Sequence, residues 1–184
     1  MVTVVWLAAL AGGGVRDAAA GEPKENAMKL ESRVLKPGET IDKEFTADGR
    51  DVSPPLAWQG APAGTKQFAL ICDDPDAPTP TPWVHWVIYG IGPDVHELPE
   101  GVPPEAQLSR PLPARQGKNS WTTGRTIGYR GPAPPKGKPH HYHFRLFALD
   151  AALDLAAGLD KNAVSKAIAG HVLAEAELVG LYSR

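Results

Sequence analysis

The hydrophobic positions of this chain fall into short runs rich in Val, Ile, Phe, Tyr and Trp, which is typical of β-strands. Segments dense in Pro and Gly separate these runs. Because Pro cannot donate to a strand ladder, such segments force turns or strand ends. The pattern therefore predicts a mostly β domain with long ordered loops. The expected strands cover residues 28–32, 41–45, 67–73, 84–91 and 140–149.

One stretch near the C-terminus has helical spacing. Val164 and Ile168 are four positions apart, Asp160 stands where a cap is needed, and Gly170 follows as a stop signal. The pattern predicts one short helix over residues 162–169.

The hydrophobic pattern of two further segments does not predict a single type of secondary structure. Residues 171–182 contain Ala, Glu and Leu, which favour a helix locally, so the pattern leaves helix and strand both open. Residues 92–127 have little strand or helix pattern, and a run of that length inside a compact domain is usually functional. We expect residues 92–127 to form a loop that shapes a site.

Length and charge narrow the classes of function. The chain has 184 residues, enough for one domain with a substantial core, and a net charge of -2. This charge argues against a nucleic-acid partner and against a polybasic membrane-surface protein. Cys72 is the single cysteine, which excludes an intrachain disulfide and a multi-cysteine metal site.

The N-terminal segment differs in composition from the rest of the chain. Residues 1–27 combine a short apolar run, an Ala-x-Ala site at Ala18 to Ala20 and a polar end, which favours a signal peptide over a disordered leader. The expected domain then covers residues 28–184, and the protein is expected to be periplasmic or secreted, with a cytoplasmic location as the alternative. No other stretch predicts a transmembrane span.

Candidate chemistry gathers in two places along the chain. His85 lies in an expected strand just after the proline-rich turn that carries Asp74 and Asp76. In the last expected strand, alternation places His140 and Tyr142 on one face, opposite His141 and His143. If these strands are neighbours, one sheet end collects carboxylate, imidazole and phenol groups, a set suited to an oxyanion.

Each of these residues also has an ordinary structural explanation. His85 is equally compatible with packing among Trp83, Trp86 and Tyr89. Asp74 and Asp76 are residue types that commonly accept backbone N–H groups within a turn. Only the combination of residues supports a site.

Several catalytic classes lack the residues they require. An H-x-H metal site of the cupin kind needs a nearby Glu that is missing after His143, so no metal is expected. No G-x-S-x-G elbow and no nucleotide-binding glycine loop is present, and Cys72 lies in an apolar run. We expect no cofactor and no catalytic residue, although a paired-carboxylate mechanism through Asp74 and Asp76 stays formally open.

The segments SPPLAW, ICDDPDAP, WVHWVIYGI, GYRGPAPP and HHYHF, in this order, resemble the phosphatidylethanolamine-binding protein family, also called the Raf kinase inhibitor protein family. The resemblance extends from about residue 28 to residue 184 and is strongest to the bacterial Raf-kinase-inhibitor-like branch. It implies a β-sandwich-like Greek-key domain with one or two short helices, a strand over the C-terminal segment, and a small pocket for phosphate-like or carboxylate anions.

The same resemblance implies which residues line that pocket. Donors from His85, His140 and Tyr142 would converge on the anion, while Asp74 orients an imidazole. His141 and His143 depart from the usual family pattern. The full set of implied ligand-binding residues is Asp74, His85, His140, Tyr142, Asp76, Trp83, Pro134 and Pro135.

The sequence predicts a non-catalytic binding protein for a small anion or phosphorylated ligand, including phospholipid. This binding protein is expected to regulate a partner protein such as a kinase. Two alternatives stay open. One is a hydrolase or lyase that uses Asp74 with His85 or His140 as acid and base. The other is a protein-interaction module with a vestigial pocket. A homodimer is compatible with the chain.

Overall fold

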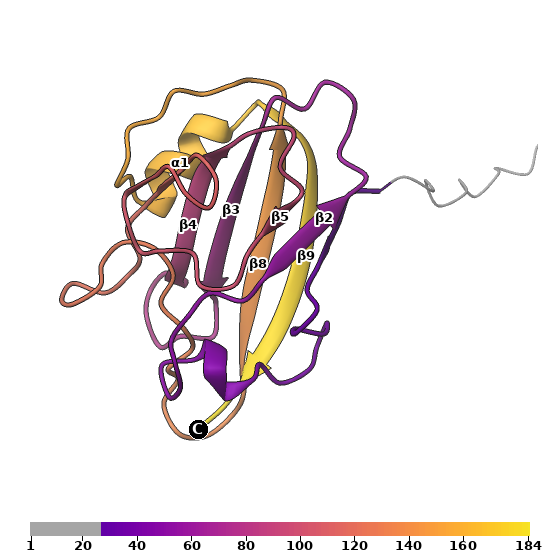
Figure 1. Cartoon of the computed structure of the whole chain (residues 1–184). Helices are drawn as coiled ribbons and strands as arrows, with labels where there is room; N and C mark the ends of the chain where they lie inside the picture. The colour runs from indigo at the N-terminus through magenta and orange to yellow at the C-terminus, as the bar shows by residue number, and fades with distance from the viewer. Residues whose placement is uncertain (1–26) are drawn as a thin grey trace, which may run out of the picture.

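A computed structural model describes residues 27–184, which form two antiparallel sheets (Figure 1). The smaller sheet has the order β1-β2-β5 and the larger has the order β6-β7-β4-β3-β8-β9. The strands of the smaller sheet are β1 (Lys29–Glu31), β2 (Leu56–Gln59) and β5 (Glu97–Leu98). Those of the larger sheet are β3 (Gln67–Asp74), β4 (Trp83–Ile91), β6 (Gln107–Leu108), β7 (Ala114–Gln116), β8 (His140–Leu149) and β9 (Val172–Tyr182).

The main hydrophobic core fills the space between the two sheets. Trp86, Phe144 and Leu146 of the larger sheet are completely buried there, together with Trp58 of β2. Sheet-on-sheet packing of this kind is the architecture of a β-sandwich. The expected fold class, mostly β with one or two short helices, is therefore confirmed.

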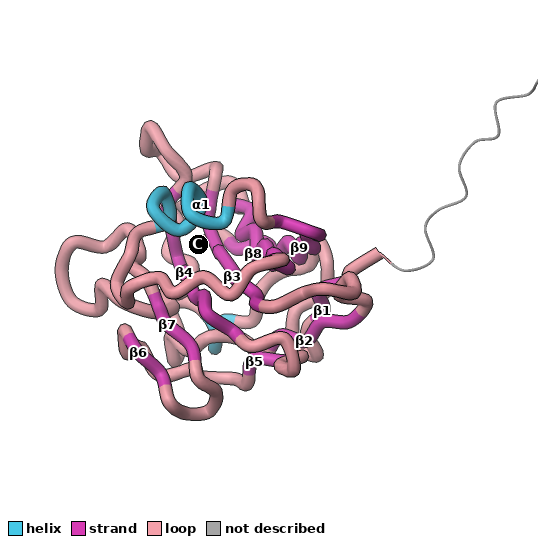
Figure 2. The backbone as a smooth tube through the Cα atoms, turned by 90° about the horizontal axis from the view of Figure 1, so that it is seen from above, coloured by secondary structure: helices cyan, strands magenta, loops and turns pink. Residues whose placement is uncertain are grey.

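The outer face of the larger sheet carries a second, smaller core under helix α1 (Lys161–Ile168). Val164 and Ile168 pack against Ile71 and Val87, so the helical spacing seen in the sequence corresponds to one buried stripe. Figure 2 shows α1 on one side of this sheet and β1, β2 and β5 on the other. The side chain of Asp160 accepts the N–H of Ala163 at 2.8 Å, which confirms the predicted cap.

The strand predicted over residues 41–45 is wrong. Lys43–Phe45 form a 3-10 turn, η1, and Ile41 only donates its N–H to the carbonyl of Leu181. The physical reason lies in Lys43, which would share one strand face with Ile41 and Phe45 but is exposed while they are buried. Burial of two residues four positions apart with an exposed residue between them suits a helical turn rather than an alternating strand.

Two other segments contain more strand than their patterns predicted. Residues 92–127 hold the short strands β5, β6 and β7, and the prolines of residues 53–58 lead directly into β2. Residues 171–182 form β9, which pairs with β8 along almost its whole length. Sheet pairing here overrides the local helix propensity of Ala, Glu and Leu.

The predicted leader, residues 1–27, lies outside the described residues except for Ala27. Within residues 27–184, no helix is both long and apolar enough to cross a membrane.

Candidate ligand pocket

A cavity of about 260 Å³ lies where β3, β4 and β8 end side by side. It continues the face of the larger sheet that carries the main core. We define two parts of its lining. The polar cluster comprises Asp74, His85, His140 and Tyr142, and the apolar wall comprises Trp83, Trp121, Pro134 and Pro135.

Asp74 and His140 form a carboxylate–imidazole pair across β3 and β8. Nδ1 of His140 lies 2.7 Å from Oδ2 of Asp74, and both side chains are largely buried. Since an ionised carboxylate only accepts, Nδ1 carries the hydrogen and Nε2 faces away from Asp74. The other carboxylate oxygen accepts the N–H of Asp76 at 2.8 Å, so Asp74 both orients the ring and stabilises its own turn.

His85 reaches the pocket because of a β-bulge in β4. Cys72 of β3 pairs with Trp86, but the next residue, Asp73, pairs with Val84, which leaves His85 without a partner on β3. Trp86 packs in the main core and Val84 packs under α1. The extra residue therefore lets His85 and Trp86 lie on the same side of the sheet, as bulges beside binding sites often do.

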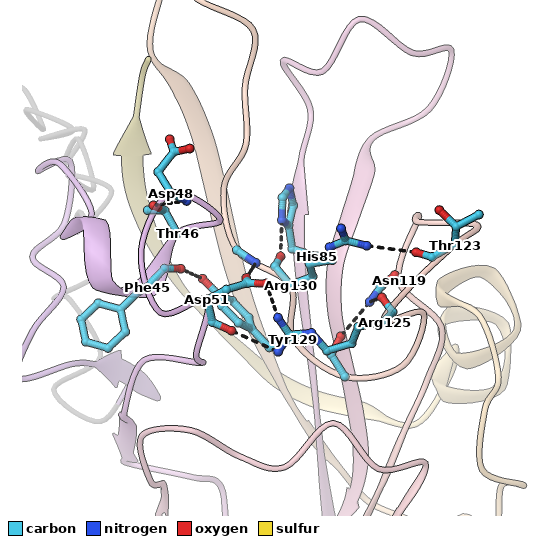
Figure 3. A network of polar contacts seen from close by, with 12 residues as sticks. Phe45, Thr46, Asp48, Asp51, His85, Asn119, Thr123, Arg125, Tyr129 and Arg130 are labelled. Atoms are coloured by element: carbon cyan, nitrogen blue, oxygen red, sulfur yellow. Dashed lines mark hydrogen bonds and ion pairs between the residues drawn. The ribbon is translucent and has the colours of Figure 1, made fainter.

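The ring of His85 is fixed by the loop that precedes β8. Its Nδ1 lies 2.6 Å from the carbonyl oxygen of Arg130, and the N–H of Arg130 donates to the carbonyl of His85 at 3.0 Å (Figure 3). Burial lowers the pKa of His85 to about 4, against the opposing effect of the Arg130 carbonyl. His85 is therefore neutral at pH 7, and its one ring hydrogen lies on Nδ1, directed to Arg130. This arrangement does not favour the expected role of His85 as a donor to an anion, and that role stays a prediction.

Tyr142 presents the most unusual polar atom of the site. The residue is 1% exposed, and its hydroxyl has no hydrogen-bond partner among the described residues. Burial raises the pKa of the phenol, so the hydroxyl keeps its hydrogen. Its ring lies edge-on to His85 at 5.1 Å between centroids. As predicted from alternation, Tyr142 and His140 share one face, and both line the pocket.

The apolar wall is built around two tryptophans. The rings of Trp83 and Trp121 meet edge-to-face at 5.3 Å, and the guanidinium of Arg130 lies 4.7 Å above the Trp121 ring. Pro134 and Pro135 complete this wall as the motif suggested. Trp121 was missed at the sequence level, although a lone Trp in the loop of residues 92–127 was the available signal.

Asp76 does not line the pocket, contrary to expectation. Its carboxylate accepts the backbone N–H of His141 at 2.8 Å and lies 2.7 Å from Nδ1 of the same residue. His143 is held by Glu177 at 2.7 Å. Both histidines lie on the outer face of β8, so their departure from the family pattern leaves the pocket lining unchanged.

A partly buried carboxylate supports the loop that holds His85. Asp51 accepts the N–H of Gly131 at 2.6 Å and forms an ion pair with Arg125 (Figure 3). The backbone of Asp51 has a φ of 57°, a left-handed conformation that Asp tolerates better than most residues. These bonds position the Arg130 carbonyl against the imidazole of His85.

No group of three or more His, Cys, Asp or Glu side chains within residues 27–184 is arranged to hold a metal ion. The fold and the pocket define a β-sandwich protein with a small, mixed polar and aromatic cavity at the end of one sheet. The cavity's volume of about 260 Å³ lies just below the roughly 300–1,000 Å³ of pockets for drug-sized ligands, so any occupant has to be small.

Comparison with known proteins assigns this class to a family. The family model described as phosphatidylethanolamine-binding protein matches residues 31–183. A UPF0098 protein of Methanothermobacter thermautotrophicus is 48% identical over 157 residues, covering 85% of this chain and 99% of the relative. The UPF0098 protein YbhB of Escherichia coli is 37% identical, covering 85% of this chain and 100% of YbhB.

A solved structure agrees with these sequence matches. The crystal structure of Escherichia coli YbcL, described as a new member of the mammalian family, has a TM-score of 0.78 and 32% identity, covering 85% of this chain and 98% of YbcL. The chain belongs to the phosphatidylethanolamine-binding protein family, in the bacterial and archaeal branch that includes YbhB and YbcL.

Proposed function

We propose that this protein is a non-catalytic binding protein whose pocket holds the phosphoryl end of a small ligand. The orphan hydroxyl of Tyr142 carries the proposal. A buried donor without a partner costs about 1–3 kcal/mol, so its presence calls for an explanation, and a ligand in the pocket that Tyr142 lines would supply the missing partner. The hydroxyl can donate to an anion oxygen within the pocket.

His140 supplies the second contact in this proposal. Asp74 holds its Nδ1, which leaves Nε2 for the ligand. When the ring is protonated, Nε2–H donates to the anion and Asp74 serves as the counter-ion within the protein. The tightly bonded Asp74 also fixes the ring, which reduces the ordering cost of binding.

The apolar wall suggests what is attached to the phosphoryl group. Trp83 and Trp121 offer ring faces and edges beside the polar cluster. An aromatic or aliphatic substituent would bury its surface against them, adding roughly 25 cal/mol per Å². The proposed ligand class is therefore an organic phosphate, with phenyl phosphate as a convenient probe.

Isothermal titration calorimetry with phenyl phosphate tests the proposal. We expect binding to the wild-type protein and a loss of at least about tenfold in affinity for His140→Ala. The matched control is His171→Ala, since His171 forms a similar pair with Asp150 at 2.8 Å and does not line the pocket. Equal binding by all three proteins would overturn the proposal.

The pair of Asp74 and His140 also suits acid–base catalysis, which supports a second candidate, a hydrolase or lyase. The same samples discriminate the two functions. Turnover of phenyl phosphate or of a panel of esters that disappears in Asp74→Asn would identify an enzyme and contradict the non-catalytic proposal.

Regulation of a partner protein such as a kinase is a further part of the proposed role. A pull-down from the native host compares the wild type with His140→Ala. Loss of a partner in the variant would link partner binding to ligand occupancy, whereas a partner retained equally by both would favour an interaction module with a vestigial pocket.

A further inference from the structure

The hydrogen-bond partners of His85 determine which of its ring nitrogens can contact a ligand. A backbone carbonyl only accepts, so the 2.6 Å contact with Arg130 requires the hydrogen to be on Nδ1. The N–H of Arg130 returns a bond to the carbonyl of His85, which fixes the two backbones together. The remaining nitrogen, Nε2, points away from Arg130 (Figure 3).

The surroundings of His85 keep the ring neutral. It is 2% exposed, with the Tyr142 ring on one side and the Trp121 ring on another, each 5.1 Å away between centroids. The charged groups that act on it are Asp74 and Asp73 on β3 and Asp51 in the supporting loop, and all favour the protonated ring. Desolvation outweighs them and depresses the pKa.

A neutral ring with its hydrogen on Nδ1 has a lone pair on Nε2. This atom accepts hydrogen bonds and cannot donate them. The pocket then combines an acceptor at His85 with the donor at Tyr142 and, when its ring is protonated, with Nε2–H of His140. A fully ionised oxyanion would place its own lone pairs against that acceptor, whereas an oxyanion that keeps one hydrogen would satisfy it.

We propose that the pocket selects singly protonated oxyanions, meaning phosphate and phosphomonoesters that carry a P–OH group, over oxyanions without a hydrogen such as sulfate and sulfate monoesters. This inference rests on the proposed phosphoryl-binding function and names its ligand class. A phosphomonoester has a second pKa of about 6, so the P–OH form is available near neutral pH. Phosphodiesters lack this hydrogen as well, so the proposed ligand class does not include the phospholipid that was expected from the sequence.

Phenyl phosphate and phenyl sulfate form a matched pair of probes, because they differ chiefly in the hydrogen. Calorimetry near pH 5 and at constant ionic strength compares the two probes when both carry one negative charge and phenyl phosphate keeps its P–OH group. The affinity should be at least about tenfold higher for phenyl phosphate, since a site built to bond a hydroxyl rejects analogues that lack it. Equal affinities would overturn this inference and leave the proposed function intact. Binding of neither probe would overturn both.

The variant His85→Gln tests the role of the acceptor directly. An amide can turn either its oxygen or its NH2 group to the ligand. The ratio of the affinity for phenyl phosphate to that for phenyl sulfate should therefore fall to nearly one. His171→Gln is the control and should keep the wild-type ratio. A folded His85→Gln protein with an unchanged preference would contradict the proposal.

A measurement on the wild-type protein covers the case in which this variant fails to fold. Long-range proton–nitrogen NMR spectra identify which ring nitrogen of His85 carries the hydrogen. We expect Nδ1 to be protonated and Nε2 to be bare at neutral pH. A hydrogen on Nε2 would overturn the inference.

Discussion

Tyr129 and Tyr142 are both fully buried, yet only Tyr129 has a partner for its hydroxyl, which donates to the carbonyl of Phe45 at 2.6 Å. One phenol therefore stabilises the fold, whereas the other faces the pocket, where the proposed function assigns its hydroxyl to a ligand.

Replacing Tyr142 by Phe should therefore separate stability from binding. Tyr142→Phe removes a buried donor that has no partner, so the free energy of unfolding should stay constant or rise, while the affinity for phenyl phosphate falls. Tyr129→Phe should instead lose about 1–2 kcal/mol of stability, because it strands the Phe45 carbonyl. Urea unfolding and calorimetry on both variants check this. A clear stability loss in Tyr142→Phe would show that its hydroxyl has a structural partner.

Asp74→Asn should weaken anion binding without unfolding the protein. An amide oxygen can still accept from His140, but it provides no counter-ion for an imidazolium, so we expect affinity to drop about tenfold. Asp150→Asn alters the exposed pair with His171 and should leave affinity unchanged. The check is calorimetry with inorganic phosphate, and similar losses in both variants would argue against a specific role for Asp74.

Stability should depend on pH through His85. Well above pH 6.5 the ring is neutral in both the folded and unfolded states and contributes nothing to the dependence. As the pH falls from 6.5 toward 4, the unfolded chain takes up a proton that the folded state refuses, so the free energy of unfolding decreases. The full effect is about 3 kcal/mol.

Urea unfolding across this range, compared between the wild type and His85→Gln, isolates the contribution of His85. The variant should show a flatter profile, and His171→Gln should retain the wild-type slope. Parallel profiles for the wild type and His85→Gln would mean that the ring titrates normally in the folded protein.

Trp121→Ala should weaken the binding of a ligand's organic substituent rather than the binding of its phosphoryl group. Removing this ring opens the apolar wall, so phenyl phosphate should lose about 1–2 kcal/mol of binding energy, while inorganic phosphate keeps its affinity. Displacement titrations with the two ligands measure the difference. An equal loss for both would indicate that Trp121 supports the polar cluster through His85.

The N-terminal segment provides an independent prediction about location. We expect export and cleavage after Ala20, since the apolar run and the Ala-x-Ala site are typical of a secretory signal. N-terminal sequencing of protein from the native host identifies the first residue. An intact Met1 would favour the cytoplasmic alternative.

Regular strands made much of the site predictable from the sequence. Alternation alone placed His140 beside Tyr142 because β8 runs without interruption through that region. The sequence marks Trp121 only as a lone Trp in a loop, and its place in the pocket was not predictable, since loop geometry between distant strands determines where it lies. The same holds for Asp51, whose role depends on a backbone bond to Gly131 that lies 80 positions away.

The proline-rich turn also shows that side chains are harder to place from the sequence in turns than on regular strands. The motif suggested two site carboxylates, Asp74 and Asp76. The carboxylate of Asp76 instead contacts His141, whose side chain lies on the face of β8 opposite the pocket. Spacing of two residues on a turn does not fix side-chain direction, in contrast to spacing of two on a strand.

Because of the bulge in β4, the pocket depends on the number of residues in this strand as well as on their chemistry. Between the pairs Cys72–Trp86 and Asp73–Val84, β4 contains one more residue than β3, namely His85. Deleting a single residue there would restore even pairing and force either His85 or Trp86 to change sides. The bulge within the Trp-x-His-Trp segment thus lets one strand place a core tryptophan and a pocket-lining histidine at adjacent positions on the same side of the sheet.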